Sequence, residues 1–460
     1  MKTDMEDPNY LNEVAEKEKK KAEYNNIPVI SYAQLQEVVS KWLLIVDPGV
    51  VKLTLATIIA NKLPGDPVWL FLIAQSGGGK TEIMNGLLKI PDYYPLSQLT
   101  PNTFLSGYKS NSKEPSLLKQ LGEPGNKTLG FKDFTSVLDS NKDAYKEIMG
   151  QFRDLYDGYM VKRTGTGDEI SWKGKMGFIA GCTPIIEQRM AMIGAMGERF
   201  MSYKIDQPNS KEVKKRIREN TGKELQMRME IQDAFAGYLK GITLPENLPE
   251  LPEEVDKMIE SLADFIALVR AVVMRSYDSK REIEYINQPE MSTRIYKQLY
   301  AIGLTLFLMN ENKWQEEDSY ILKRLAVSSV HSSRHNLIKE IQSYKTQVKT
   351  STLATVLGYP TSTTRRHLED LAAISMDKGT VRILKRTHQG VGKPDLWELT
   401  QAMREILKDM GDGIEPTKED NGFEEEEKDL PVGASPPEEE KLNSVTAGMS
   451  EEEQINAGLI

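Results

Sequence analysis

The segment Ser76-Gly77-Gly78-Gly79-Lys80-Thr81 constrains the fold more than any other part of the chain. The residues before it, 68–74, are apolar without interruption, which is the pattern of a strand buried on both faces of a parallel sheet. The residues after it place apolar side chains at helical spacing. A strand, a glycine-rich turn and a helix in this order form a phosphate-binding loop of the Walker A type, here with Ala74 where the first glycine usually stands.

The residue types of this loop indicate its ligand. Backbone N–H groups of the glycines can surround phosphate oxygens, and the positive end of the next helix attracts an anion. Lys80 would reach the terminal phosphates, and the Thr81 hydroxyl would ligate Mg²⁺. We therefore predict ATP and Mg²⁺ as ligands; the alternative is a glycine-rich turn with a chance Lys-Thr pair. The predicted nucleotide-binding residues are Ala74, Gln75, Ser76, Gly77, Gly78, Gly79, Lys80 and Thr81.

Asp133 is the predicted second metal ligand. It follows the apolar run Leu129–Phe131 with one residue between, as an aspartate that holds the metal-bound water should. The alternative is an ordinary aspartate that caps the next helix. Many ATPases of this kind carry a glutamate next to that aspartate, but here the next residue is Phe134, so the sequence assigns no general base.

Two further apolar runs indicate that the loop belongs to an α/β fold with a parallel sheet. Residues 128–131 and 176–182 have the pattern of buried strands, with helical patterns before and after them. Segments 159–164 and 169–172 flank a glycine-containing turn, so they predict a β-hairpin immediately before the second run.

Composition sets the class and the compartment. The single cysteine, Cys182, excludes a disulfide framework and favours the cytosol. No apolar run approaches the about 20 residues of a membrane span, so we expect a cytoplasmic protein without a membrane partner. The net charge of -9 belongs to the C-terminal end, since residues 411–460 hold 15 acidic and 3 basic residues. Residues 345–400, in contrast, hold 9 basic and 5 acidic residues.

These shifts in pattern divide the chain into five parts. We predict a mobile arm over 1–30, the nucleotide-binding core over 31–205 and a helical lid or linker domain over 206–345. A small basic module follows over 346–400. The Glu- and Pro-rich segment 411–460 is predicted to be a disordered acidic tail.

The order of these features resembles the AAA+ ATPases, within them the clade with a β-hairpin before sensor 1, and most of all the helicase-like AAA+ proteins of phages and mobile elements. The resemblance covers about residues 30–400. It implies that Thr183, at the end of Phe178-Ile-Ala-Gly-Cys-Thr183, is sensor 1. It also implies that Arg199 is an arginine finger for a neighbouring subunit and that Arg294 is sensor 2. The alternatives are a plain strand end for Thr183, a self-paired surface arginine for Arg199 and an exposed first-turn arginine for Arg294.

Hairpins of this clade line a central pore and contact DNA phosphates. The corresponding residues here are Lys162, Arg163 and Lys173, whose charges suit contacts with a backbone of any sequence. A solvated surface hairpin would have the same composition.

Residues 350–399 resemble a winged helix. Segment 351–357 would be its first helix, and 362–373 the recognition helix, which exposes Thr363, Thr364, Arg365, Arg366 and His367. Segments 381–386 and 395–399 would form the wing, with Arg382, Lys385, Arg386 and Lys393 placed for phosphates. Winged helices also dock proteins, so DNA contact is one of two expectations.

The leading hypothesis is an ATP-driven DNA motor that forms a homo-oligomeric ring, with a hexamer as one option, such as a helicase-like replication protein of a phage or mobile element. The second is an ATP-gated DNA-binding switch or helicase loader with weak hydrolysis, which the missing glutamate beside Asp133 favours. A protein remodeller is a third, although we find no aromatic pore loop for it. The acidic tail is either a solubilising extension or a segment that binds a protein partner or competes with DNA.

Overall fold

The computed structural model describes residues 18–19, 21–106, 116–163, 167, 169–187, 198–276, 278, 281–376, 379–390 and 393–420. All of them belong to one compact unit, which ends at Asp420. None of the helices in these ranges is long and apolar enough to cross a membrane.

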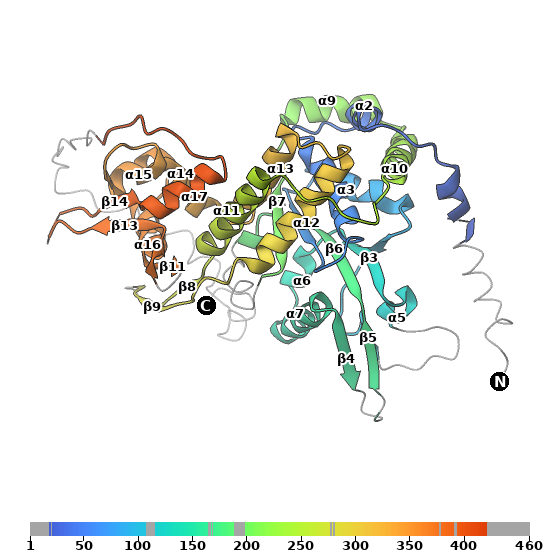
Figure 1. The fold of residues 1–460 in the computed structure, drawn as a ribbon, viewed down its shortest axis with the longest axis horizontal. Helices are drawn as coiled ribbons and strands as arrows, with labels where there is room; N and C mark the ends of the chain where they lie inside the picture. Colours follow the sequence, from blue (N-terminus) through green and yellow to red (C-terminus); the bar gives the residue numbers. More distant parts are fainter. Residues whose placement is uncertain are drawn as a thin grey trace, which may run out of the picture. The chain divides into compact units, whose positions relative to one another are not determined.

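A five-stranded parallel sheet in the order β2-β3-β6-β1-β7 forms the centre of the fold (Figure 1). The strands are β1 (Trp69–Ile73), β2 (Tyr93–Leu96), β3 (Gly125–Phe131), β6 (Lys175–Cys182) and β7 (Phe200–Lys204). All four neighbouring pairs are parallel, so the carboxyl ends of the strands share one edge of the sheet. The predicted α/β fold class with a parallel sheet is therefore confirmed.

Both faces of the sheet are covered by other elements. This burial explains why the sequence of β1 is apolar throughout. Its side chains alternate, so Leu70 and Leu72 belong to one hydrophobic core and Trp69, Phe71 and Ile73 to the other. The second core is rich in aromatic rings; Phe71 stacks on Phe200 of β7 with ring centroids 3.9 Å apart. A strand between two cores must be apolar at every position.

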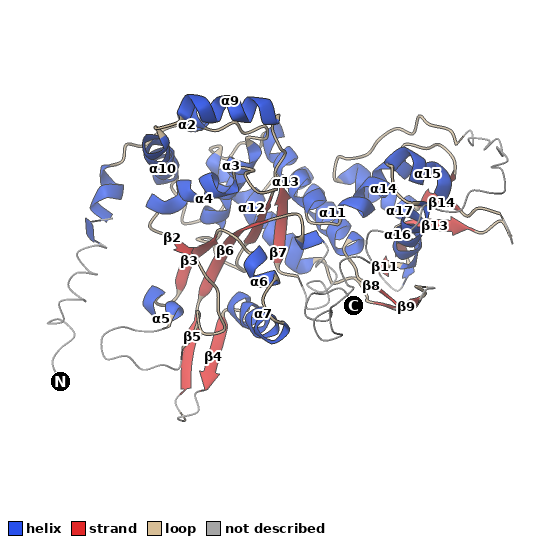
Figure 2. Ribbon diagram, turned by 180° about the vertical axis from the view of Figure 1, so that it is seen from behind, coloured by secondary structure: helices blue, strands red, loops and turns tan. Residues whose placement is uncertain are grey.

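Helices pack on the two faces of the sheet (Figure 2). The first core contains α2 (Tyr32–Trp42), α3 (Gly49–Ala60), α4 (Lys80–Gly86), α10 (Glu224–Lys240), α11 (Glu253–Val269), α12 (Thr293–Met309) and α13 (Glu316–Ser328). The second contains α6 (Thr135–Leu138) and α7 (Lys142–Tyr156), and next to α7 lies the antiparallel hairpin of β4 (Tyr159–Arg163) and β5 (Glu169–Lys173). The predicted hairpin is thus present, although most of its turn lies outside the described residues.

A buried charge pair joins the first core to the later helices. Lys52 of α3 and Asp318 of α13 are both fully buried, with Nζ and Oδ1 2.9 Å apart. Asn310 and the backbone N–H of Gln315 donate to the other Asp318 oxygen at 2.6 and 2.9 Å. Because a buried charge without partners is costly, this pair specifies how α3 and α13 pack against each other.

The C-terminal module contains helices around a small antiparallel sheet. Its helices are α14 (Ser332–Gln342), α15 (Thr350–Leu357), α16 (Thr361–Ala373) and α17 (Gln401–Asp409). Its sheet has the order β10-β14-β13, with β10 (Val348–Lys349), β13 (Leu384–Thr387) and β14 (Leu396–Leu399). The predicted wing extended further: Val381 and Arg382 form β12 (Val381–Arg382), which pairs with β11 (Ser375–Met376) rather than with β14.

Four strands contradict or extend the sequence-based expectations. β2 and β7 were not predicted. Residues 188–197, which come before β7, lie outside the described ranges. The segment expected to be mostly helical also contains an antiparallel hairpin, β8 (Val273–Arg275) and β9 (Ile283–Ile286).

Both predicted terminal boundaries also differ. Residues 21–26 are helical, and Lys240 of α10 donates a hydrogen bond to the carbonyl of Ile27 at 3.0 Å, so part of the predicted arm is packed. At the other end, Asp420 accepts hydrogen bonds from the backbone N–H of Lys349 at 2.9 Å and from Thr352 at 3.0 Å. The packed chain therefore extends nine residues beyond Gly411, where the acidic tail was expected to begin.

Candidate functional site

The phosphate loop connects β1 to α4 at the carboxyl edge of the sheet. Gly77 and Gly79 adopt the left-handed conformation, with φ of 78° and 81°, and Gly79 is the residue before the first turn of α4. Side chains rarely adopt this conformation, which explains glycine at both positions. Gly78 is needed for a different reason, because a Cβ atom there would lie 2.8 Å from Cβ of Ala74 and 2.9 Å from the Gln207 amide.

Lys80 folds back over the loop. Its ammonium donates hydrogen bonds to the carbonyls of Ala74 and Gln75, the second at 3.0 Å. Partial burial lowers the pKa of Lys80, while the neighbouring Cys182 and Asp133 act in the opposite direction. The ammonium is thus held at the mouth of the loop, where Gln75, Ser76 and Thr81 are exposed.

Asp133 and Thr183 lie at the same edge as the loop. Asp133 is exposed, and its Oδ1 accepts the backbone N–H of Thr135 at 3.0 Å. The Thr135 hydroxyl is 3.3 Å from the Thr183 hydroxyl, so the segments after β3 and β6 are joined. Because β6 lies between β1 and β3, Thr183 emerges between the loop and Asp133. Lys80, Asp133 and Thr183 therefore converge, and their individual roles stay predictions.

Exposed oxygens at this edge fit a hydrated divalent cation. Mg²⁺ is usually held by one or two protein oxygens together with substrate phosphates and water. The Thr81 hydroxyl and the Asp133 carboxylate are exposed at the mouth of the loop and match that donor set. Phe134, in contrast, is fully buried and packs against Phe71, so it is a core residue and not a substitute for a general base.

Arg199 lies at the opposite, amino edge of the sheet. It directly precedes β7, whose first residue, Phe200, pairs with Trp69 at the start of β1. Its guanidinium lies 3.3 Å from the Asp157 carboxylate and 5.4 Å from the centroid of the Tyr156 ring. The side chain is only 12% exposed, and burial lowers the pKa of Arg199.

Arg294 lies at the amino edge as well, which corrects the expectation that it reads ATP in its own subunit. Its Nη1 donates to the carbonyl of Glu198 at 3.2 Å, next to Arg199. The phosphate loop follows the other end of β1, about 13 Å away at the ordinary strand rise. The sequence predicted that Arg294 opens a helix but not the edge at which that helix begins.

Two functional candidates at this edge were missed by the sequence-based interpretation. Arg270 is bonded to Glu290 through Nε at 3.0 Å, and its Nη2 donates to the carbonyl of Glu198 at 3.4 Å. Glu198 is fully buried, which raises its pKa to about 7 with a smaller contribution from Glu290. We refer to Arg199, Arg270, Arg294, Glu198, Glu290 and Asp157 as the amino-edge cluster. No local motif marks it, because its members come from four separate segments.

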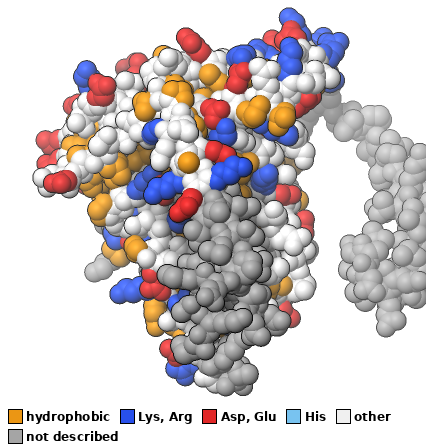
Figure 3. Space-filling model, turned by 90° about the vertical axis from the view of Figure 1, so that its right-hand side faces the viewer, with side chains coloured by type: hydrophobic (Ala, Val, Ile, Leu, Met, Phe, Trp, Pro, Cys, Tyr) orange, Lys and Arg blue, Asp and Glu red, His pale blue; other side chains and the backbone are white. Residues whose placement is uncertain are grey.

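The three basic residues of the predicted pore hairpin differ in their partners and exposure. Lys162 donates to the side chain of Asn102 at 2.7 Å, whereas Arg163 pairs with Glu169 across the hairpin at 3.1 Å. Lys173 is exposed at the end of β5. Figure 3 shows one face of the molecule, on which basic and acidic side chains are interspersed rather than gathered by sign.

The predicted recognition helix is α16, and one expected contact residue is not on its surface. Arg365 and Arg366 are exposed, but Thr364 is fully buried and donates to the carbonyl of Pro360 at 3.1 Å, which corrects its predicted exposure. His367 is half-buried with its ring 5.7 Å from that of His331. Helical periodicity turns these two positions toward the module's core.

The predicted wing residues differ in how they are paired. Lys385 lies 2.8 Å from Glu398, and Arg386 lies 2.6 Å from Asp395. Arg382 and Lys393 are exposed, and no described acidic residue pairs with either. Contact with DNA by these residues stays a prediction.

Comparisons with known proteins do not assign a family. No family model matches the chain, and neither does any curated protein. Among solved structures it is similar to a candidate ATPase from Cytophaga hutchinsonii, with 14% sequence identity, coverage of 70% of this chain and 90% of that one, and a TM-score of 0.37. At that TM-score the likeness carries no argument about function, which therefore depends on the site itself.

Proposed function

We propose that this protein is a Mg²⁺-dependent ATPase of the AAA+ type. The observation that carries the proposal is the convergence of Lys80, Asp133 and Thr183 on a glycine loop at the start of α4. Loop N–H groups and the Lys80 ammonium would bind the β- and γ-phosphates, and Thr183 would orient the terminal phosphate or the attacking water. Bound Mg²⁺, held by Thr81 and Asp133, would neutralise charge on the phosphates.

We further propose that the site is completed by a neighbouring copy. Within one chain no arginine of the amino-edge cluster can reach the phosphate loop, since the two lie at opposite ends of β1. Head-to-tail association would bring the amino edge of one subunit to the carboxyl edge of the next, and a heterologous contact of this kind forms a ring when the rotation between subunits closes. Arg199, and now Arg294 with it, would then stabilise the charge that develops during phosphoryl transfer.

Nucleic acid is the proposed substrate of the motor. The β4–β5 hairpin carries Lys162, Arg163 and Lys173, and the C-terminal module has the helix-turn-helix and hairpin order of a winged helix. Exposed cations of this kind bind phosphates without reading sequence, as a translocating DNA helicase-like protein requires. A replication role in a phage or mobile element remains part of the proposal by resemblance alone.

A second candidate is an ATP-gated DNA-binding switch or loader. Phe134 favours it, because its fully buried ring occupies the position of the water-activating glutamate of many such ATPases. A switch needs ATP binding but little turnover.

The test is ATP turnover with and without single-stranded DNA, for the parent protein, Lys80→Ala and Arg199→Ala. The motor predicts that DNA raises turnover and that both substitutions lower it by about a hundredfold or more. If ATP binds but turnover is absent or indifferent to DNA, the motor is wrong and the switch takes its place. If ATP does not bind to the parent protein, both proposals fail.

A further inference from the structure

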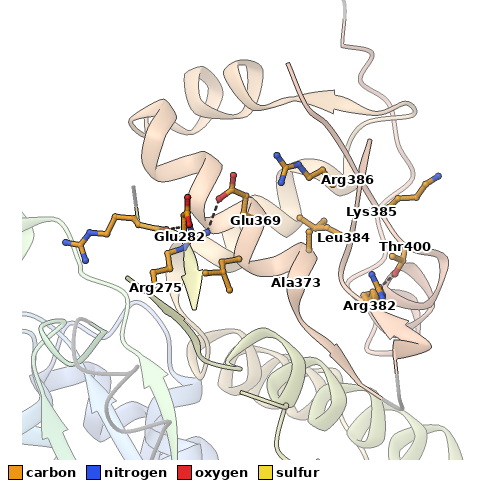
Figure 4. Close-up of a pocket in the computed structure, with 12 residues that line it drawn as sticks. Arg275, Glu282, Glu369, Ala373, Arg382, Leu384, Lys385, Arg386 and Thr400 are labelled. Carbon is orange, nitrogen blue, oxygen red and sulfur yellow. Dashed lines mark hydrogen bonds and ion pairs between the residues drawn. The ribbon is translucent and has the colours of Figure 1, made fainter. Parts of the chain in front are cut away.

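A cavity of about 820 Å³ lies between the β8–β9 hairpin and the C-terminal module (Figure 4). Five basic residues line it, from two parts of the chain that are separated by about a hundred residues: Arg275, Arg281, Arg382, Lys385 and Arg386. The acidic residues in its lining are Glu282 and Glu369. Its apolar lining is limited to small or aliphatic side chains, so the cavity lacks the aromatic wall that a flat organic ligand usually contacts.

Arg275 joins the two walls of the cavity. From β8 its guanidinium reaches α16, where it lies 3.0 Å from the Glu369 carboxylate and 2.8 Å from that of Asp370. It also donates to the carbonyls of Arg366 at 3.1 Å and Arg281 at 2.7 Å. The side chain is 14% exposed, so Arg275 is a positioning residue that holds the hairpin against the helix.

The backbone of Arg281 has a strained conformation. It has a φ of 52°, in the left-handed region that residues with a side chain rarely adopt, and its carbonyl in that conformation accepts the bond from Arg275. Such strain persists where the surroundings impose it and is frequent at binding sites. Its own side chain is exposed, and it pairs with no described acidic residue.

The opposite wall supplies further cations. Arg382 of β12 is exposed and pairs with no described acid. Lys385 and Arg386 are 66% and 42% exposed in their pairs with Glu398 and Asp395, and surface pairs of this kind contribute about 0–1 kcal/mol, so they can be exchanged for other anions. In Figure 4, Arg386 extends toward the side of Glu369 and Lys385 in the opposite direction, so cations are spread along the cavity.

We propose that this cavity is a nucleic-acid cleft, in which the β8–β9 hairpin forms a second wall and Arg281 and Arg382 contact backbone phosphates from opposite sides. Spread, exposed cations on an open cleft fit a chain of phosphates, whereas a single small anion would need convergent donors in an enclosed pocket. The inference deepens the proposed function, on which it depends for the class of ligand. It adds the β8–β9 hairpin to the two regions that the sequence predicted to contact DNA, the β4–β5 hairpin and the C-terminal module.

The test measures binding of a labelled single-stranded oligonucleotide by fluorescence anisotropy over a series of salt concentrations. The variant is Arg281→Ala combined with Arg382→Ala, and the matched control is Arg218→Ala, an exposed arginine on helix α9 (Ser210–Asn220). Loss of two phosphate contacts should weaken binding about thirtyfold at low salt and reduce the slope of log K against log salt by about 1.4. The control should leave both unchanged, and melting temperature should be the same for all three proteins.

Three results would overturn the inference. If the parent protein binds the oligonucleotide and the double variant binds it with the same affinity and slope, the cleft is not the site, although the proposed function survives. If micromolar pyrophosphate displaces the oligonucleotide from the parent but not from the double variant, the cavity is a small-anion site. If the parent protein binds neither single-stranded nor duplex DNA, the inference and the nucleic-acid part of the proposed function both fail.

Discussion

The polar groups at the two ends of β1 differ in their exposure and in their pairing. At the carboxyl edge, most of the phosphate loop and Asp133 are exposed, and the Lys80 ammonium donates to loop carbonyls. At the amino edge, the arginines of the amino-edge cluster are largely buried and bonded to carboxylates and carbonyls. An edge with exposed polar groups is suited to receive a ligand, whereas an edge with paired, largely buried charges is suited to hold side chains in place. Substitutions at the first edge should therefore change activity, and those at the second should also change stability.

The largest effect is expected for Lys80→Ala. In the proposed site the ammonium contacts the terminal phosphates, so its removal should lower ATP turnover roughly a thousandfold, by analogy with other electrostatic contacts to a transferred phosphoryl group. Because the Lys80 ammonium donates to carbonyls of its own loop and pairs with no acidic side chain among the described residues, the thermal midpoint should stay unchanged. Turnover assays and melting curves check this, with Lys89→Ala in the following turn as the control. A large loss of stability would show that Lys80 is structural.

Arg270→Ala should have the converse effect. It removes one partner of a mostly buried ion pair and leaves Glu290 with Arg294 at 3.6 Å as its remaining partner. Breaking buried pairs in this way costs about 3–5 kcal/mol, so the urea midpoint should fall sharply. Equilibrium unfolding measures it, and Lys257→Ala, which breaks an exposed pair in α11, is the control. An unchanged urea midpoint would show that the ion pairs of the amino edge do not stabilise the fold.

The Arg199→Ala variant tests whether the amino edge of one subunit acts at the carboxyl edge of another. If the proposed ring forms, turnover should fall about a hundredfold with ATP binding retained, because Arg199 would act on the phosphate bound by a neighbouring subunit. A mixture of Arg199→Ala and Lys80→Ala subunits should regain part of the turnover, since an intact loop of one variant can then meet an intact arginine of the other. Mixing at several ratios measures this, and a mixture as inactive as its components would place Arg199 outside the catalytic site.

Glu198 gives a smaller effect that depends on pH. Burial raises its pKa to about 7, above the unfolded value, so the folded state retains a proton that the unfolded state has lost. The contribution of Glu198 to the free energy of unfolding is therefore highest at acidic pH, and it decreases as the pH rises toward and through 7. Glu198→Gln should therefore be about 3 kcal/mol more stable than the parent at pH 8 and equal to it near pH 4, as judged by urea unfolding at both values. A pH-independent difference would mean that Glu198 is ionised in the fold.

The smallest effect is expected for Gly79→Ala. A residue with a Cβ atom at φ of 81° should cost about 1 kcal/mol, although a Cβ atom would meet nothing within 4 Å. Gly65→Ala, a turn glycine at φ of 99° with equally open space, is the matched control for stability. If both variants lose the same amount of stability but only Gly79→Ala loses ATP binding, the left-handed conformation of Gly79 is needed to bind the ligand.

The sequence by itself predicted those parts of the fold that local chemistry specifies. Residues 68–74 are apolar at every position because both faces of β1 are buried, and the glycines that follow are the residues that tolerate left-handed turns. β3 and β6 were predicted for the same reason, and the β4–β5 hairpin from its glycine-containing turn. The positions of Asp133 and Thr183 after strands and of Lys80 at a helix start were predicted with them. Each of these signals is contained in a few consecutive residues.

Only the tertiary structure decided which strand ends and helix starts meet. β2 contains a proline and two exposed residues, and β7 has polar residues that are buried only because neighbouring elements cover them, so neither has a strand signal of its own. The edge at which Arg294 lies, the burial of Thr364 and the placement of β8–β9 against α16 depend on contacts between residues far apart in the chain. Such contacts are set by the free energy of packing the whole core, and no short segment carries that information.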